Sequence, residues 1–185
     1  MKKIILLLAF VFTLNAFGQY KRQNVIKTGV LRDLVGYLNI QYEHAFTDKS
    51  SLNGLMFFNN DVIKLDNTNS IETSSFGIDI GYRYYYLKKH LAPKGLYVSP
   101  GLTFQMSSID GFTGDAVGLN GNYTEFGIFG VAGYQYIFKF GLTFDVYIGF
   151  KSYVSSADIE YEGEKVNVGD TGTTLDLGLT IGYAF

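Results

Sequence analysis

The chain has no cysteine, so its fold does not depend on disulfide bonds and no thiolate is present to hold a metal ion. Proline is almost as scarce, with 2 residues in 185. Lysine and arginine are not in excess either. The formal net charge is −2, which argues against the basic surface that nucleic-acid binding needs. After residue 18, no segment approaches the ~18 uninterrupted apolar residues that a membrane helix requires.

Aromatic residues and glycine, in contrast, are abundant. The chain holds 15 tyrosines, 16 phenylalanines and 22 glycines, and soluble domains rarely contain so many aromatic residues without a very large core. A small β-barrel in a lipid bilayer carries such rings on its outer surface, and it uses glycine where strands bend or backbones crowd. The composition therefore favours a transmembrane barrel.

The N-terminus has the pattern of a secretory signal peptide. Residues 1–3 form a short basic region, residues 4–12 are uninterruptedly apolar, and Ala16 and Gly18 place small residues at the −3 and −1 positions of a cleavage site. We expect residues 1–18 to be the signal peptide and residues 19–185 to form the mature domain. An uncleaved N-terminal anchor is the alternative, which the cleavage site disfavours.

The last eleven residues alternate strictly between two faces. One face is apolar and the other is small or polar, over the ~9–11 residues with which a tilted strand crosses a membrane. The apolar face holds Leu175, Leu177, Leu179, Ile181, Tyr183 and Phe185, and the other face holds Asp176, Gly178, Thr180, Gly182 and Ala184.

The same alternation recurs along the chain and predicts eight strands. A lipid-exposed open sheet would leave its edge amides unpaired, so the strands must close. We therefore predict an all-β fold, an eight-stranded antiparallel up-and-down transmembrane β-barrel. The other expected strands cover residues 24–31, 38–46, 51–60, 76–86, 96–106, 125–136 and 142–151.

The connections between these strands predict the orientation. Short turns at 47–50, 88–94 and 138–140 belong to the periplasm, and long polar loops at 61–72, 108–122 and 155–173 belong outside, apart from a tight outer hairpin at Arg32 and Asp33. Both termini then lie in the periplasm. An aromatic girdle is expected at the periplasmic end, formed by Phe46, Tyr84, Tyr86, Tyr134, Tyr136, Tyr183 and Phe185.

The terminal Tyr183-Ala184-Phe185, with Gly178 and Gly182 upstream, resembles the C-terminal signal that the barrel-assembly machinery recognises. The overall plan is similar to the OmpA/OmpX-type barrel. Residues 24–28 and 40–46 also resemble uncharacterised small barrels common in Bacteroidetes, although Gly29 and His44 depart from that pattern. The resemblance implies an outer-membrane location, with lipids, lipopolysaccharide and the assembly machinery as partners. It implies no known activity.

The predicted lumen carries both charges and rings. An eight-stranded barrel is only wide enough for its own side chains, and buried charges must pair. We expect Arg83 to bridge Glu43 and Asp145 within a polar plug. The alternative is a narrow cation path, favoured by five acids against three bases once Glu125 and Lys151 are counted. The expected structural ion-pair network is Lys27, Glu43, Asp79, Arg83, Asp145 and Asp176.

No pattern points to catalysis, a metal or a cofactor. Both histidines are expected near the periplasmic end, His44 facing outward and His90 in a turn, too far from the outer rim for rim chemistry. The acids of residues 155–173 lack the 12-residue calcium-loop spacing, although exposed loops often bind partners. We expect a structural or adhesive outer-membrane protein. A narrow pore for ions or very small solutes is second, and a lipid- or peptide-modifying enzyme third.

Overall fold

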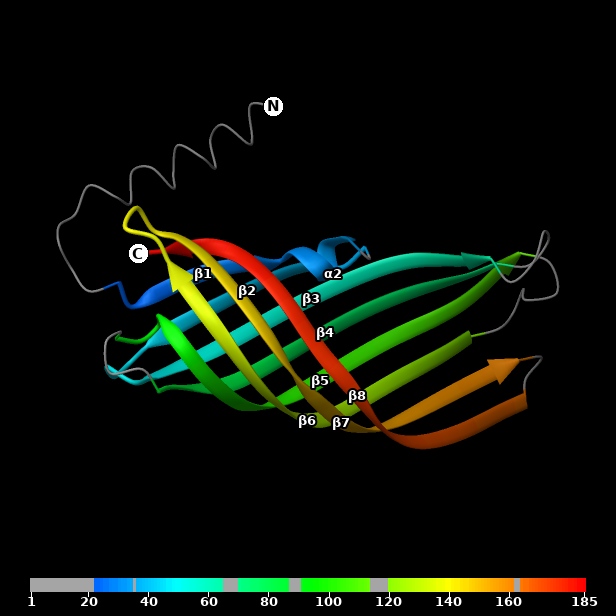
Figure 1. Ribbon diagram of the computed structural model, residues 1–185. Coiled ribbons are helices and arrows are strands. Elements are labelled where there is room, and N and C mark those ends of the chain that lie inside the picture. Colours follow the sequence, from blue (N-terminus) through cyan, green and yellow to red (C-terminus); the bar gives the residue numbers. More distant parts are fainter. Residues whose placement is uncertain (1–21, 35, 65–69, 87–90, 114–119, 162–163) are drawn as a thin grey trace, which may run out of the picture.

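The computed structural model describes residues 22–34, 36–64, 70–86, 91–113, 120–161 and 164–185. These residues form eight strands that close into a barrel, each strand antiparallel to its neighbour in sequence, with β8 pairing back onto β1 (Figure 1). The expected signal peptide, residues 1–18, lies outside the described residues. No helix in the described part of the chain is long and apolar enough to cross a membrane.

The predicted eight-strand, up-and-down order is confirmed, with strands that differ widely in length. The elements are β1 (Asn24–Gly29), α2 (Val30–Leu34), β2 (Leu38–Ala45), β3 (Ser50–Lys64), β4 (Ser70–Tyr85), β5 (Gly95–Thr113), β6 (Asn120–Ile137), β7 (Leu142–Tyr161) and β8 (Glu164–Ala184).

Side chains alternate between the lumen and the outer surface as the sequence predicted. On β6, Phe126 and Ile128 are exposed, whereas Glu125 and Gly127 are buried. The result inverts the usual soluble fold, because charged groups are buried and apolar groups face outward. The exposed apolar side chains continue around the barrel and include Ile40, Met56, Ile80, Leu102, Ile128, Val146, Ile148 and Leu177.

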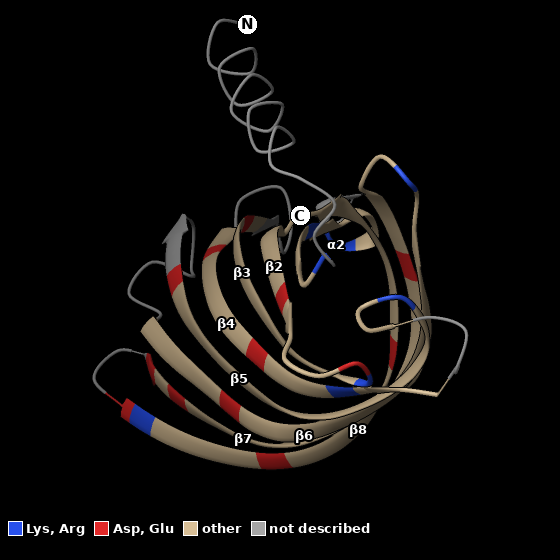
Figure 2. Ribbon diagram, turned by 90° about the vertical axis from the view of Figure 1, so that its left-hand side faces the viewer, with Lys and Arg blue, Asp and Glu red and all other residues tan. Residues whose placement is uncertain are grey.

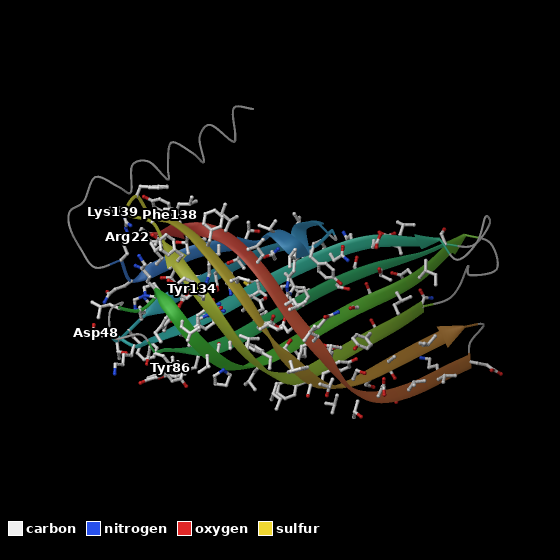
Figure 3. The ribbon with its side chains drawn as sticks, in the orientation of Figure 1. Arg22, Asp48, Tyr86, Tyr134, Phe138 and Lys139 are labelled. Carbon is white, nitrogen blue, oxygen red and sulfur yellow. The ribbon has the colours of Figure 1, made fainter. Side chains whose placement is uncertain are left out.

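The two ends of the barrel differ. At the end that carries Phe185, which we call the C-terminal end, tight turns such as the one through Gly141 (φ 103°) join the strands. Tyr86, Tyr134 and Phe138 lie at this end (Figure 3). Aromatic rings contact one another here, with Tyr84 and Tyr86 5.2 Å apart between ring centres and Tyr136 and Phe138 4.8 Å apart.

At the opposite end, which we call the hairpin end, strands extend far into the segments that were expected to be long polar loops. β7 and β8 remain paired from Ser155↔Asp170 to Tyr161↔Glu164, and β5 and β6 remain paired out to Asp110↔Asn120. Figure 2, which views the barrel from its C-terminal end, shows charged residues at the distant ends of β7 and β8. Strand pairing needs only backbone groups, so polar residues continue the ladder where water solvates both faces.

The first hairpin also differs from the prediction. The strand expected to reach residue 31 ends at Gly29, and the tight turn expected at Arg32 and Asp33 is the short helix α2, followed by Gly36 with φ 87°. Asn39 ends the ladder, because its amide Oδ1 accepts from Gly29 N (2.6 Å) and its Nδ2 donates to Gly29 O (3.2 Å). β1 and β2 therefore have 6 and 8 residues beside 21 in β8 and 15 in β3, and the barrel wall is low on this side.

Candidate functional site: the charged lumen

Four charged side chains from four strands meet in the half of the lumen nearest the C-terminal end. Lys27 (β1) lies 2.9 Å from Glu43 (β2) and 3.0 Å from Asp145 (β7), measured between Nζ and the nearest carboxylate oxygen. Arg83 (β4) approaches the same two oxygens through Nη1, at 3.1 Å and 2.8 Å. Each of the four is at most 2% exposed. Together they form the four-charge cluster, which carries no net charge.

Neutral side chains complete this cluster. The hydroxyls of Ser51 and Tyr85 donate to Glu43 Oε1, each at 2.5 Å, and Tyr97 donates to Asp145 Oδ1 at 2.7 Å. Gln135 accepts from Lys27 Nζ at 2.6 Å and from Arg83 Nη1 at 3.2 Å. Charge-assisted hydrogen bonds of this kind are about twice as strong as neutral ones.

The cluster connects opposite walls of the barrel. Gln135 also donates through Nε2 to Glu43 Oε2 (3.1 Å) and to Pro93 O (2.5 Å), which ties the segment before β5 to the lumen. The guanidinium of Arg83 lies 4.1 Å from the centre of the Tyr97 ring. A barrel of this size holds little more than its own side chains, and this cross-linked layer of buried groups lies across the lumen.

Arg83 was expected to span Glu43 and Asp145 with its planar fork, and the structure does bring it between them. Both bonds come from Nη1, however, and the Nε of Arg83 has no hydrogen-bond partner within the described ranges. Lys27 contacts the same pair of carboxylates. The bridge is therefore shared between two cations on strands β1 and β4.

The structure does not bring the rest of the expected network into this cluster. Asp79 pairs with Arg32 of α2, at 3.3 Å between Oδ2 and Nη2, in the half of the lumen nearer the hairpin end. Arg32 was not expected in the lumen, because the sequence predicted a turn rather than a helix at that point. Asp176 faces the same region, within electrostatic range of Arg32 and Asp79. Asp79, Asp176 and Arg32 are called the upper group below.

A separate ion pair lies beyond the upper group, toward the hairpin end. Lys151 Nζ is 2.8 Å from Glu125 Oε1, and Tyr123 donates to Glu125 Oε2 at 2.7 Å. The lumen charges therefore divide into three levels along the barrel axis. Sequence alternation assigned the strand side chains to the lumen and led to the pairing of Arg83 with Glu43 and Asp145, but it did not predict the partners of Asp79 and Lys27.

The sequence analysis also did not predict that interior aromatic rings pack directly against glycines on neighbouring strands. A Cβ added at Gly178 would meet the Tyr147 ring on the neighbouring strand β7, and one at Gly77 would meet the Phe57 ring on β3. Glycine in a strand often marks such a close approach. The signal was present as glycines placed directly opposite inward aromatic residues, and the strand register was needed to recognise it.

The residues that resemble the assembly signal lie where β8 pairs with β1. The backbone N–H of Phe185 donates to Asn24 O at 2.9 Å, and the side chain of Phe185 is exposed. A Cβ on Gly182 would meet the backbone of Ile26 and Lys27. Gly178, Gly182 and the terminal residues thus have packing roles of their own, and their recognition by the assembly machinery stays a prediction.

His44 lies on the exposed outer face, with its Nδ1 2.8 Å from Asn24 Oδ1, and His90 is outside the described residues. Within the part of the chain that the structure describes, no three His, Asp or Glu side chains are grouped to hold a metal ion.

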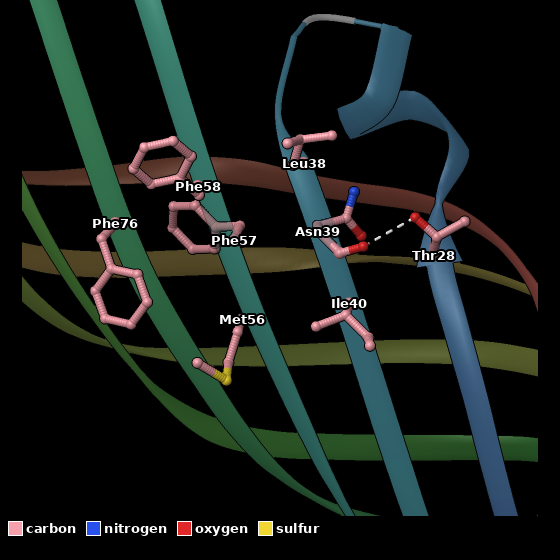
Figure 4. A pocket seen from close by; sticks show the side chains of 8 residues that line it. All are labelled: Thr28, Leu38, Asn39, Ile40, Met56, Phe57, Phe58 and Phe76. Atoms are coloured by element: carbon pink, nitrogen blue, oxygen red, sulfur yellow. Dashed lines mark hydrogen bonds between the residues drawn. The ribbon is translucent and has the colours of Figure 1, made fainter. Parts of the chain in front are cut away.

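An apolar pocket of about 430 Å³ lies on the outer wall beside α2 (Figure 4). Its apolar lining comes from β2, β3 and β4, and Thr28 Oγ1 donates to Asn39 O at 3.0 Å. The lining residues are Thr28, Leu38, Asn39, Ile40, Met56, Phe57, Phe58 and Phe76.

A family model described as "Protein of unknown function (DUF3575)" matches residues 3–175. The chain belongs to this family. The region shared with the DUF3575 family includes all four residues of the four-charge cluster and Arg32 and Asp79, and it stops one residue before Asp176. No curated protein matches the chain.

Proposed function

We propose that this DUF3575 protein is an integral barrel of the bacterial outer membrane, with a lumen closed by the four-charge cluster and a structural or adhesive role carried by the strands beyond the membrane. The observation that carries the proposal is the combination of an exposed apolar belt outside and buried charges inside. Soluble monomers rarely expose apolar patches larger than a few hundred Å², and here they continue around the wall.

The dimensions of this belt fit a bilayer. Outward apolar side chains run from Phe126 to Tyr136 on β6 and from Leu175 to Phe185 on β8, the ~9–11 residues that a tilted strand needs to cross. Beyond them, toward the hairpin end, the same faces carry Thr124 and Thr173. The change from apolar to polar marks the outer boundary of the proposed membrane region.

The proposed orientation follows from the ends of the barrel. The tight turns and the aromatic rings near Tyr134 and Phe138 suit the periplasmic side, and the long hairpins suit the outside. Both termini then lie in the periplasm, where a cleaved signal peptide would leave the mature N-terminus. Outer-membrane lipids and lipopolysaccharide would cover the belt, and the barrel-assembly machinery would insert the chain.

The extended strands are the proposed contact surface. β7 and β8 continue about ten residues beyond the belt as a paired hairpin, in which β7 is exposed on its outward face and β8 on both faces. A paired ribbon presents a firmer surface than a loop, which suits adhesion or the docking of an external partner. The proposal includes no catalytic step and no cofactor.

The belt is tested by placing one charge at two levels of one strand face. Val146 and Ser156 both point outward from β7, Val146 within the belt and Ser156 beyond it. We expect Val146→Arg to lower the free energy of unfolding by ~2–4 kcal/mol, because arginine at mid-bilayer is costly in barrels. Ser156→Arg, the matched control, should change it by less than ~0.5 kcal/mol.

Unfolding by urea from phospholipid vesicles measures both variants. The chain has no tryptophan, so far-UV circular dichroism or the gel shift between folded and heated protein serves as the signal. Equal losses for the two variants would mean that no membrane boundary lies between Val146 and Ser156. Fractionation of bacteria that produce the full chain then tests the outer-membrane location itself.

A further inference from the structure

The turn that joins β6 to β7 carries exposed aromatic rings, although turns in water are usually made of polar residues and glycine. It reads Phe138-Lys139-Phe140, and Phe140 is 63% exposed. The ring of Phe138 is central to an aromatic group, with ring centres 4.8 Å from Tyr136, 5.4 Å from Phe140 and 5.9 Å from Phe144. Aromatic rings are favoured at the level of lipid headgroups. The turn therefore continues the exposed apolar belt to the C-terminal end of the wall.

Cationic side chains gather at the same turn. Arg22, which precedes β1, donates from Nη1 to Phe138 O at 2.8 Å and from Nη2 to Lys139 O at 2.6 Å, so its guanidinium is held against the turn (Figure 3). Lys139 itself is exposed. A third cation adjoins them, since Lys94 Nζ donates to the preceding carbonyl, Ile137 O, at 3.0 Å. Backbone carbonyls hold Arg22 and Lys94 in place but do not neutralise their charge.

The charge balance at this turn favours an anion. Among the described residues the ion pairs lie in the lumen and on the β7–β8 hairpin, and none of them includes Arg22, Lys94 or Lys139. The site remains positive even when the C-terminal carboxylate of Phe185, at the same end of the barrel, is counted. A surface of one sign of charge attracts ligands of the opposite sign. Positive charge and exposed rings are thus combined in one place.

We propose that the β6–β7 turn binds an anionic phospholipid of the leaflet at the C-terminal end, its phosphate held by Arg22 and Lys139 and an acyl chain lying against Phe138 and Phe144. The inference rests on the proposed membrane location and adds a preferred lipid to it. A guanidinium offers five N–H donors in a fork that fits phosphate oxygens, and the two carbonyl bonds of Arg22 leave donors available. A zwitterionic headgroup gains less, because it brings its own cation. A soluble anion would leave the rings uncovered.

The site is tested by native mass spectrometry of the folded full chain, released from detergent micelles that contain equal amounts of phosphatidylglycerol and phosphatidylcholine. We expect wild-type barrel to retain phosphatidylglycerol in preference to phosphatidylcholine. Lys139→Gln should weaken this binding about fivefold, which corresponds to the ~1 kcal/mol that a basic residue near a membrane contributes, and Lys139→Arg should preserve it. Lys49→Gln is the matched control, because Lys49 is an exposed lysine of the turn between β2 and β3, at the same end, and follows Asp48. It should leave the preference unchanged.

Equal retention of the two lipids by the wild-type chain would overturn the proposal. Equal losses in Lys139→Gln and Lys49→Gln would also overturn it, because the preference would then come from diffuse charge at this end of the barrel. Displacement of phosphatidylglycerol by inorganic phosphate at constant ionic strength would indicate a site for a free anion instead. The membrane location is tested separately by Val146→Arg and Ser156→Arg. If those variants reveal a membrane boundary while the two lipids bind equally, this inference alone fails.

Discussion

In the half of the lumen nearest the C-terminal end, every charged group of the four-charge cluster contacts two groups of opposite charge, and neutral donors occupy the remaining carboxylate oxygens. In the half nearer the hairpin end, Asp79 contacts one partner, Arg32, whose side chain is 28% exposed. The first arrangement is closed to solvent and balanced within itself. The second has one carboxylate more than its single cation and is partly open to water.

This difference indicates which part of the lumen contributes most to the stability of the barrel. A saturated buried network rigidifies its surroundings, and the loss of one member leaves the others unpaired. A partly exposed pair contributes little, because water replaces either partner. The four-charge cluster should therefore act as the structural closure of the barrel, and the upper group should tolerate change.

The largest expected effect is that of Arg83→Ala. It leaves Glu43 and Asp145 with Lys27 as their one remaining cation in the described structure, and we expect a loss of about 3–5 kcal/mol in the free energy of unfolding. Adding Glu43→Gln should restore part of it, because one uncompensated charge is removed. Urea unfolding followed by circular dichroism measures both variants.

Planar-bilayer recordings of the same protein separate a plug from a pore. The wild-type chain should show no unitary conductance, because the cluster crosses the lumen. Cation conductance in Arg83→Ala with unchanged stability would contradict the plug and favour the narrow-pore alternative.

A smaller effect should follow from Tyr97→Phe. The change removes the hydroxyl that donates to Asp145 Oδ1 at 2.7 Å and leaves the ring against Arg83 in place. Hydrogen bonds to charged groups contribute about 1.5–3 kcal/mol, and we expect a loss in this range by thermal or urea unfolding. Tyr147→Phe is the matched control, because this ring also faces the lumen and its hydroxyl forms no hydrogen bond with any of the described residues. If Tyr147→Phe lost as much stability, the hydroxyl of Tyr97 in the cluster would contribute no more than a hydroxyl without a hydrogen bond.

The smallest effect should be that of Arg32→Ala. The pair with Asp79 is partly exposed, and such pairs contribute up to ~1 kcal/mol. We expect a loss within this limit at low salt, and less at high salt because ions screen exposed pairs. If Arg32→Ala instead matched Arg83→Ala, the contrast between the two halves of the lumen would not hold.

The sequence predicted the faces of the strands because the outer surface and the lumen of a closed barrel impose opposite demands on alternate residues. Glu43, Arg83 and Asp145 could therefore be assigned to the interior from their neighbours alone. Their similar depth along the strands also predicted that Arg83 contacts Glu43 and Asp145, which the structure shows. That Lys27 shares the same two carboxylates could not be predicted, since β1 and β7 are not adjacent and the meeting point depends on strand stagger around the ring. The separation of Asp79 from this cluster has the same origin.

Two parts of the fold carried no readable signal. Beyond Ser155, β7 is half-buried at most and the facing part of β8 is exposed on both faces, so polar residues there look like a loop although the ladder continues. At the first hairpin, Val30 and Leu31 extend the apolar pattern of β1, and the bonds of Asn39 to Gly29 end the strand. A side-chain amide that replaces a backbone partner leaves no trace in hydrophobic periodicity.

The outer half of β8 also bears on how this chain can change over generations. Residues 164–171 are exposed on both faces and no interior depends on them, whereas a Cβ at Gly178 or Gly182 would collide with packed neighbours. Substitutions should accumulate at one end of a single strand and be purged at the other. In the proposed outer-membrane orientation, a lineage under pressure from antibodies or phages could thus alter the most prominent part of its surface while the barrel beneath stays the same.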